Sequence, residues 1–240
     1  MCDSPLRVLE QRLVERLSQL KPYPDALLEM GCGEGRTLLA LKHGHNMHVS
    51  GVDVHEPSLS ALKHAGIDAR ACDMRSLPFE DNTFDWVLIA NSLHHIANPR
   101  DATREGARVA RHGLVICEPW LDQTIASQRT TYTLCEWSNS LLQSFGFFHR
   151  AGLSAGEILE SIDFAAASAE VHQELFIARW NVQQWLANLK PWIDKLSHDH
   201  YLRWRLNQLL KTLPVSAATE AGQTIVVIRK APVRADSLSS

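Results

Sequence analysis

The sequence predicts an α/β fold in which a doubly wound, mainly parallel sheet carries helices on both faces. Short apolar segments of strand length alternate with segments of helical length between residues 26 and 119. The first strand ends in a turn with glycines at alternating positions, and a helix follows directly. Later strands end in polar or acidic residues, at the edge where such sheets bind ligands.

Length and composition place the chain among ordinary globular proteins. Its 240 residues suit one α/β domain with an elaboration, and 45% of them are hydrophobic and 21% charged. The net charge of −3 argues against bulk binding to nucleic acid or anionic membranes. No apolar run approaches membrane-spanning length and no signal-peptide layout is present, so we expect a cytoplasmic protein. The five scattered cysteines indicate neither a disulfide framework nor a zinc site.

Leucines at helical spacing predict an amphipathic helix over residues 5–20. Ser4 would cap it, Pro5 suits its first position, and two prolines after residue 21 end it. Two interpretations stay open for this helix. It either packs on the edge of the sheet or also forms part of a cover over the ligand site.

A glycine-rich turn organises the next part of the chain. Residues 27–30 read as a buried strand, and a helix opens at residue 37. Gly31 permits the tight turn, Gly33 lets a ligand approach bare backbone, and Gly35 lets helix and strand pack closely. The free amides of the helix then face an anionic part of the ligand. This geometry is typical of a nucleotide-type site.

The spacing of the glycines selects among nucleotide ligands. A dinucleotide fingerprint needs its third glycine at position 36, where this chain has Arg36. The Gly-Lys-Ser/Thr triplet of a phosphate-binding loop is absent. The remaining pattern, Glu29 followed by glycines at 31, 33 and 35, resembles the first motif of the Rossmann-like S-adenosylmethionine-dependent methyltransferases.

Further strands are expected over residues 48–54, 68–72, 86–90 and 113–117. Asp53 ends the second strand about 20 residues after Gly33, the interval at which an acidic side chain meets ribose hydroxyls. An Asp at this place can equally cap the next helix, but residues 57–60 already offer a start for it.

Residues 26–119 as a whole resemble the small-molecule branch of the class I methyltransferases, the group often called type 11. Leu-Pro-Phe at 77–79, Phe-Asp at 84–85 and Leu-His-His at 93–95 carry this resemblance together with the glycine motif. Residues 111–113 depart from the family's usual Pro-Gly-Gly, which alters a turn and touches no ligand contact. The resemblance implies a seven-stranded mixed sheet whose last strand is antiparallel, with helical insertions.

The resemblance also implies that S-adenosyl-L-methionine is the cofactor. Asp73 would contact the adenine amino group, Met74 would pack on the ring, and Glu29 would meet the methionine amino group, often through water. The expected cofactor-binding residues are Glu29, Gly31, Cys32, Gly33, Gly35, Asp53, Val54, Asp73, Met74, Asn91 and Ser92.

His94, His95 and Glu118 are the candidates for catalysis. Alignment and exclusion of water supply most of the rate of methyl transfer, and a base is needed only when the acceptor must lose a proton. Histidine suits that work because its pKa lies near neutrality. We hypothesise that one histidine is the base or positions the acceptor, with Glu118 as its partner. The alternative is that the histidine pair only holds its loop.

The resemblance thins after Glu118. We expect helix over residues 120–144, a capping box from Ser154 to Glu157, and a helical stretch from 181 to about 213 with breaks at Pro191 and near His198. Strands are expected over 165–177 and 223–228. The predicted organisation is a cover helix (1–24), a cofactor-binding core (25–119), a remainder of the same domain with helical acceptor-side insertions (120–230) and a flexible tail (231–240).

Other polar and aromatic clusters have two interpretations each. The aromatics at 145–148, with Trp120, Tyr132 and Trp137, either line an acceptor pocket or pack in the core, and Phe147-Phe148 beside Gly146 would suit a lid. His149, Arg150 and Arg129 either bind an anionic group or lie in solvent. The histidines at 43, 45 and 48 lack Cys or carboxylate partners and fall away from the ligand side, so we expect no metal.

The expected function is methyl transfer from S-adenosylmethionine to a small organic acceptor, without a membrane or nucleic-acid partner. Two alternatives stay open. One is a non-catalytic S-adenosylmethionine-binding partner or regulatory subunit. The other is a dinucleotide-dependent oxidoreductase, which Arg36 and the Leu-His-His segment disfavour. The identity of the acceptor and the oligomeric state stay open.

Overall fold

The structure is a computed structural model that describes residues 5–45 and 47–231. Its strands are β1 (Ala26–Met30), β2 (His48–Asp53), β3 (Asp68–Ala71), β4 (Phe84–Ala90), β5 (Ala110–Trp120), β6 (Ala166–Glu174) and β7 (Gly222–Lys230). Its α-helices are α1 (Pro5–Ser18), α2 (Arg36–His45), α3 (Ser60–His64), α4 (Pro99–Val109), α5 (Ala126–Gln143), α6 (Ala155–Glu160), α7 (Val182–Ile193) and α8 (Tyr201–Thr212). Short 3-10 helices are η1 (Glu56–Leu59), η2 (Leu93–His95) and η3 (Val215–Ala217).

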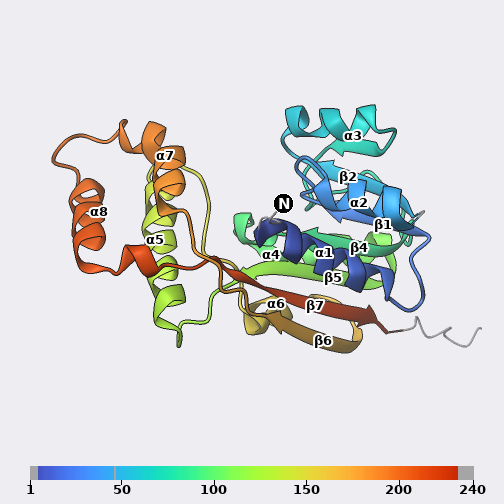
Figure 1. Cartoon of the computed structure of the whole chain (residues 1–240). Helices are drawn as coiled ribbons and strands as arrows, with labels where there is room; N and C mark the ends of the chain where they lie inside the picture. The colour runs from blue at the N-terminus through green and yellow to red at the C-terminus, as the bar shows by residue number, and fades with distance from the viewer. Residues whose placement is uncertain (1–4, 46, 232–240) are drawn as a thin grey trace, which may run out of the picture.

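The strands form one seven-stranded sheet in the order β3-β2-β1-β4-β5-β7-β6 (Figure 1). The pairs from β3 through β5 are parallel, whereas β7 runs antiparallel to both β5 and β6. The order reverses at β1, which places a crevice for ligands beyond the carboxyl ends of β1 and β4. The predicted doubly wound, seven-stranded mixed sheet is confirmed.

The two faces of the sheet bury separate apolar layers. Alternate strand residues such as Leu27 and Leu88 pack with leucines of α1, α2 and α3 on one face. Their neighbours Leu28 and Ile89 pack on the other face with residues of α4 and α6. All four of these side chains are fully buried, which is why the central strands read as continuous apolar runs in the sequence.

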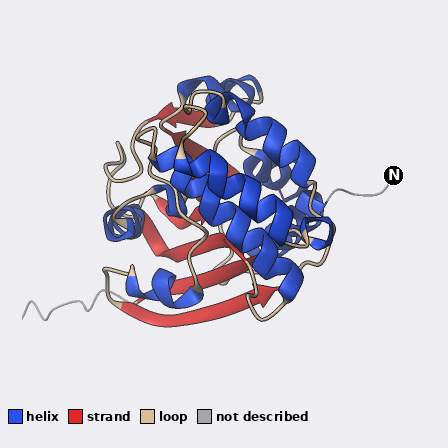
Figure 2. Cartoon of the chain, turned by 90° about the vertical axis from the view of Figure 1, so that its left-hand side faces the viewer, coloured by secondary structure: helices blue, strands red, loops and turns tan. Residues whose placement is uncertain are grey.

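Helices α5, α7 and α8 form a third apolar core beside the carboxyl ends of the strands (Figures 1 and 2). Leu134 and Leu141 of α5 are buried with Leu206 and Leu209 of α8. The indole N–H of Trp137 donates a hydrogen bond of 2.9 Å to the carbonyl of Leu202. The insertion after β5 and the insertion before β7 therefore build one body.

Three local expectations are wrong. Strand β6 ends at Glu174 rather than at 177, because its partner β7 begins at Gly222 and the last pair is Glu174 with Gln223. Helix α7 passes through Pro191 to Ile193, since a proline in the last turn removes only one hydrogen bond of the helix. Residues 111–113 form no turn, because α4 leads directly into β5 at Ala110.

The predicted caps of the later helices are present. Ser154 and Glu157 form the capping box of α6, and the Asn181 side chain accepts the backbone N–H of Gln184 at 3.0 Å. The predicted cap Ser4 lies outside the described residues, and so does the predicted tail except for Ala231. Within the part of the chain that the structure describes, none of the helices has the length and apolarity that a membrane span requires.

A pair of substitutions in the glycine turn tests its packing. At Gly35 (φ +71°) a Cβ would lie 2.2 Å from Cδ2 of the fully buried Leu62 on α3, whereas at Gly33 (φ +50°) it would meet nothing within 4 Å. Both alanines strain the backbone, but only Gly35→Ala also overpacks the core. We expect Gly35→Ala to lower the free energy of unfolding by about 1–3 kcal/mol more than Gly33→Ala in urea denaturation. Equal losses would contradict this packing.

Candidate active site

The turn from β1 into α2 is built on left-handed glycines. Gly31, Gly33 and Gly35 have φ of +71°, +50° and +71°. The N–H of Gly31 donates to the carbonyl of Val52 at 2.8 Å, and a Cβ on Gly31 would lie 2.6 Å from that of Ser92. Ser92 thus leaves no room for a side chain at position 31, whereas the space beside Gly33 is free. Gly35 gives room to Leu62 on α3, so it serves helix–helix contact rather than the helix–strand packing expected.

Asp53 at the end of β2 ties this turn in place. Its Oδ2 accepts the N–H of Gly33 at 2.8 Å, and its Oδ1 accepts the N–H of His55 at 2.8 Å. Asp73 is paired with the guanidinium of Arg75 at 2.6 Å, and this hydrogen bond lowers the pKa of Asp73. Asp53, Val54, Asp73, Met74 and Ser92 border neither of the two cavities described below. The ribose and adenine contacts of these residues stay predictions.

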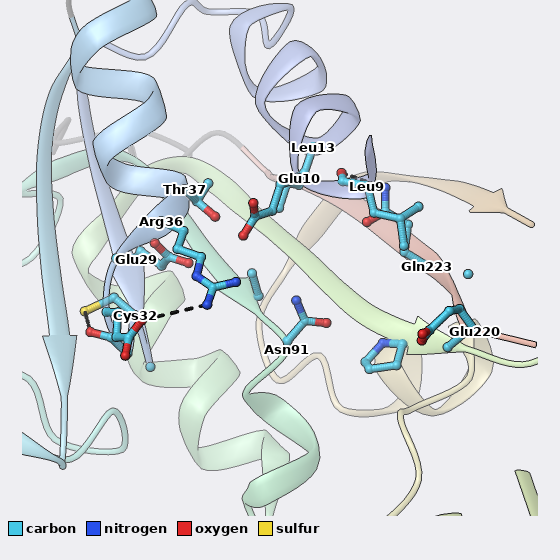
Figure 3. Close-up of a pocket in the computed structure, with 18 residues that line it drawn as sticks. Leu9, Glu10, Leu13, Glu29, Cys32, Arg36, Thr37, Asn91, Glu220 and Gln223 are labelled. Atoms are coloured by element: carbon cyan, nitrogen blue, oxygen red, sulfur yellow. Dashed lines mark hydrogen bonds and ion pairs between the residues drawn. The ribbon is translucent and has the colours of Figure 1, made fainter. Parts of the chain in front are cut away.

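A cavity of about 460 Å³ lies beside the glycine turn (Figure 3). Six of the predicted cofactor-binding residues border it: Glu29, Gly31, Cys32, Gly33, Gly35 and Asn91. Helix α1 borders the same cavity through Leu9, Glu10 and Leu13, and it also packs on the sheet through Leu17. The first helix therefore makes both of the contacts that were considered for it.

Glu29 is the unusual group in this cavity. Its side chain is only 4% exposed, and its Oε2 has no hydrogen-bond partner among the described residues. Burial, followed by the charges of Glu10 and Asp53, raises the pKa of Glu29 to about 8. A buried carboxyl with an unpartnered oxygen at a cavity wall is suited to a cationic ligand group.

Several residues at this cavity were not predicted from the sequence as ligand contacts. Arg36 and Thr37 at the start of α2 and Glu10 of α1 border it with Glu29 (Figure 3). Residues 220–223 reach it from the start of β7. Arg36 directly follows the last glycine, which is a usable signal. No local signal marks residues 220–223, because only the antiparallel return of β7 brings them there.

The predicted partnership of Glu118 with a histidine is present in the geometry. Glu118, at the end of β5, is fully buried and accepts the N–H of Leu93 at 2.9 Å and the Nδ1–H of His94 at 2.7 Å. A carboxylate only accepts hydrogen bonds, so Nδ1 of His94 carries the proton and Nε2 keeps a free lone pair. The same carboxylate also holds the loop through the N–H of Leu93. A role of the histidines in catalysis stays a prediction.

His95 and His149 lie against His94. The ring centroid of His94 is 4.2 Å from that of His95 and 5.1 Å from that of His149, and the last two are 4.6 Å apart. Burial, followed by the neighbouring His94, lowers the pKa of His95 to about 4. Burial, followed by His95, lowers the pKa of His149 to about 4 as well. Both rings are neutral at pH 7.

A second cavity of about 820 Å³ lies between the strand ends and helices α5 and α7. His94 and His149 border it, and aromatic rings form much of its wall: Trp120, Tyr132, Trp180 and Trp185. Trp137 lies in the helical core, and Phe145 and Phe147 pack on Trp192 instead of bordering the cavity. Pro119, Glu220 and Ala221 border both cavities, so the two are adjacent.

The remaining clusters are separated by the fold. Arg150 borders the second cavity, and its Nε and one terminal nitrogen are buried without a partner among the described residues. Arg129 instead donates to the carbonyl of Gln123 at 2.9 Å. Among the residues described, the one group of three side chains with metal-ligand spacing is His94, His95 and His149, and the histidines at 43, 45 and 48 do not form such a group.

Comparison with known proteins matches part of the chain to one family. Residues 28–117 match the family described as "Methyltransferase domain". A 27-O-demethylrifamycin SV methyltransferase of Amycolatopsis mediterranei is 31% identical over 112 residues, covering 42% of this chain and 41% of that protein. A human protein named "Probable tRNA methyltransferase 9B" is 29% identical over 100 residues, covering 42% of this chain and 21% of that protein. The chain thus spans less than two thirds of the length of these curated relatives.

Solved structures share the fold. A Thermotoga maritima S-adenosylmethionine-dependent methyltransferase, described as a possible histamine N-methyltransferase, superposes with a TM-score of 0.60 at 16% identity, covering 95% of this chain and 92% of that one. The family match falls on the segment that contains the glycine turn, Asp53 and the Leu-His-His loop. Residues 28–117 thus match a methyltransferase domain, and the chain shares the fold of class I, Rossmann-like methyltransferases.

Proposed function

We propose that this protein transfers the methyl group of S-adenosylmethionine to a small organic acceptor bound in the 820 Å³ cavity. The observation that carries the proposal is the wall shared by the two cavities, formed by Pro119, Glu220 and Ala221. Methyl transfer requires the donor and acceptor atoms in line at close range. Adjacent cavities, one beside the glycine turn and one beside His94, meet that requirement.

The first cavity supports the binding of the cofactor. Glu29 would pair with the methionine ammonium group, which compensates its unpartnered buried oxygen. Arg36 would pair with the carboxylate of the same moiety from the start of α2. Each oxygen of Asp53 has a further lone pair beyond its bond to backbone, so ribose hydroxyls still find acceptors there.

The second cavity supports a small acceptor that is neutral or cationic. Four carboxylate residues border it (Asp122, Glu136, Glu157 and Glu220), against the single guanidinium of Arg150. Such a wall repels phosphate groups, and the net charge of −3 acts in the same direction. The aromatic rings suit an organic skeleton. These features favour a small molecule over RNA as the acceptor, despite the similarity to a tRNA methyltransferase.

The His94–Glu118 pair suits an acceptor that carries a hydroxyl group. The cofactor supplies an electrophilic methyl group. Nε2 of His94 would take the proton that the acceptor hydroxyl loses when its oxygen accepts this methyl group. Glu118 keeps Nδ1–H in place at 2.7 Å and stabilises the imidazolium that results. S-adenosylhomocysteine and the methyl ether are the products.

Calorimetry and a transfer assay test the proposal. We expect the purified chain to bind S-adenosylhomocysteine, and to methylate members of a panel of aromatic alcohols and amines with labelled cofactor. Lack of affinity for S-adenosylhomocysteine would overturn the whole proposal, and affinity for a nicotinamide dinucleotide instead would favour an oxidoreductase. Cofactor binding without transfer to any acceptor, tRNA included, would leave the non-catalytic partner.

The raised pKa of Glu29 predicts that the protein releases a proton when the cofactor binds. With its pKa near 8, the free carboxyl is mostly protonated at pH 7, and a ligand ammonium group favours its ionised form. Binding of S-adenosylhomocysteine at pH 7 should therefore release up to one proton, and affinity should rise from pH 6 to pH 8. Calorimetry in buffers of different ionisation enthalpy measures the release. Glu29→Gln should abolish it and weaken binding about tenfold or more; an unchanged release in the variant would reject the assignment.

Glu118→Gln tests the positioning role of this carboxylate. An amide cannot accept both N–H groups equally or stabilise an imidazolium, so turnover should fall by about 10²–10⁴-fold. The acidic limb of the pH–rate profile, where the imidazole becomes protonated, should also move to lower pH. Affinity for S-adenosylhomocysteine should change little.

Glu136→Gln is the matched control, because Glu136 borders the same cavity but accepts its hydrogen bond from the side chain of Asn139 rather than from His94. It should retain the pH profile of the unmodified protein. A Glu118→Gln enzyme with an unshifted acidic limb would show that Glu118 only holds the loop.

A further inference from the structure

We propose that His94, His95 and His149 form a binding site for one divalent transition-metal ion, with zinc as the best match. One ring nitrogen from each residue lies within 4.8 Å of the other two. Three imidazoles with an open fourth position are a known ligand set for zinc, and imidazole also binds the other late first-row metals. No carboxylate or thiolate is needed to complete such a set.

The partners of the other ring nitrogens support this site independently. Nδ1 of His94 donates to Glu118 at 2.7 Å, and Nδ1 of His149 donates to Oδ1 of Asn139 at 2.5 Å. Both acceptors are deeply buried, with Glu118 0% and Asn139 3% exposed. Metal-ligating histidines characteristically donate their second N–H to a carboxylate or carbonyl oxygen, which fixes the ring and leaves Nε2 free to bind the metal. Two of the three rings are held in this way.

The three ring nitrogens need to move only slightly closer together to bind one ion. Zinc–nitrogen bonds of about 2.0–2.1 Å in a tetrahedral site place the nitrogens about 3.3 Å apart. Nitrogens that already lie within 4.8 Å reach this spacing through modest rotations of the rings. His95 can make such a rotation because it is exposed at the end of η2, while the half-buried His149 keeps its hydrogen bond to Asn139. Their exposure also gives the ion a path from solvent.

The site opens towards the acceptor. His94 and His149 border the 820 Å³ cavity, so the fourth position of a bound ion would face it. The inference goes beyond methyl transfer, because metal affinity requires neither cofactor nor acceptor. Ligation and proton acceptance use the same Nε2 lone pair of His94, so a bound ion would exclude that imidazole from acting as the base.

Cobalt titration tests the site. Metal-free full-length protein, without cofactor or acceptor, is titrated with Co²⁺ while its visible absorption is recorded, and Zn²⁺ is then added as a competitor. We expect one equivalent of four- or five-coordinate Co²⁺, displaced by one equivalent of Zn²⁺. His95→Ala and His149→Ala should each weaken binding at least tenfold, and Asn139→Ala should weaken it by about 10–100-fold through the loss of a supporting hydrogen bond.

The double variant His43→Ala/His45→Ala is the matched control, because it removes two histidines that do not belong to the group. It should bind Co²⁺ like the unmodified protein. Absence of a ligand-field spectrum, or a loss of binding in the control rather than in His95→Ala, would overturn the proposal. His95 is exposed, so its alanine variant should fold, and a thermal melt by circular dichroism checks this. The spectrum is independent of turnover, so failure of methyl transfer would leave this test intact.

Discussion

The whole ligand side of this molecule depends on how β1 passes into α2. The backbone there takes left-handed conformations at residues 31, 33 and 35, and contacts with Ser92 and Leu62 leave no room for side chains at the first and last of them. Backbone N–H groups of the turn donate hydrogen bonds to the carbonyl of Val52 and the carboxylate of Asp53, and these bonds fix the turn. Because no side chain fills the space beside this fixed turn, a cavity forms there. Glu29 is buried at the cavity wall, and its Oε2 has no hydrogen-bond partner in the part of the chain that the structure describes.

The neighbouring side of the crevice depends on a second buried carboxylate. Removing a carboxylate from water is costly unless hydrogen bonds compensate it. Glu118 meets this condition with the N–H groups of Leu93 and His94, so it orders the η2 loop and selects one tautomer of the imidazole together. Glu29 and Glu118 thus differ in how the cost of burying a carboxyl group is compensated. The carboxylate of Glu118 accepts two hydrogen bonds within the protein, whereas Glu29 is the carboxyl that we propose to be paired by a ligand.

The parts that follow local rules were predictable from the sequence. Apolar runs and glycine spacing predicted the sheet and the tight turn after β1, and the shared edge of β4 and β5 predicted that Glu118 would meet a histidine. The residues around the 820 Å³ cavity were harder to predict from the sequence. His149 and Glu220 reach the site through the packing of inserted segments, for which residue spacing carries no signal. The end of β6 was missed for a related reason, because the length of its partner decides it.

The 820 Å³ cavity is bordered by a helical body whose segments come from both sides of β6 in the sequence. Helix α5 leaves the sheet after β5, whereas α7 and α8 are inserted before β7, and they share one core. Neither piece can be exchanged alone without exposing that core. Divergence of acceptor preference among descendants of this chain would therefore require coordinated change in two separate insertions, while the nucleoside-binding half evolves under its own, independent constraints.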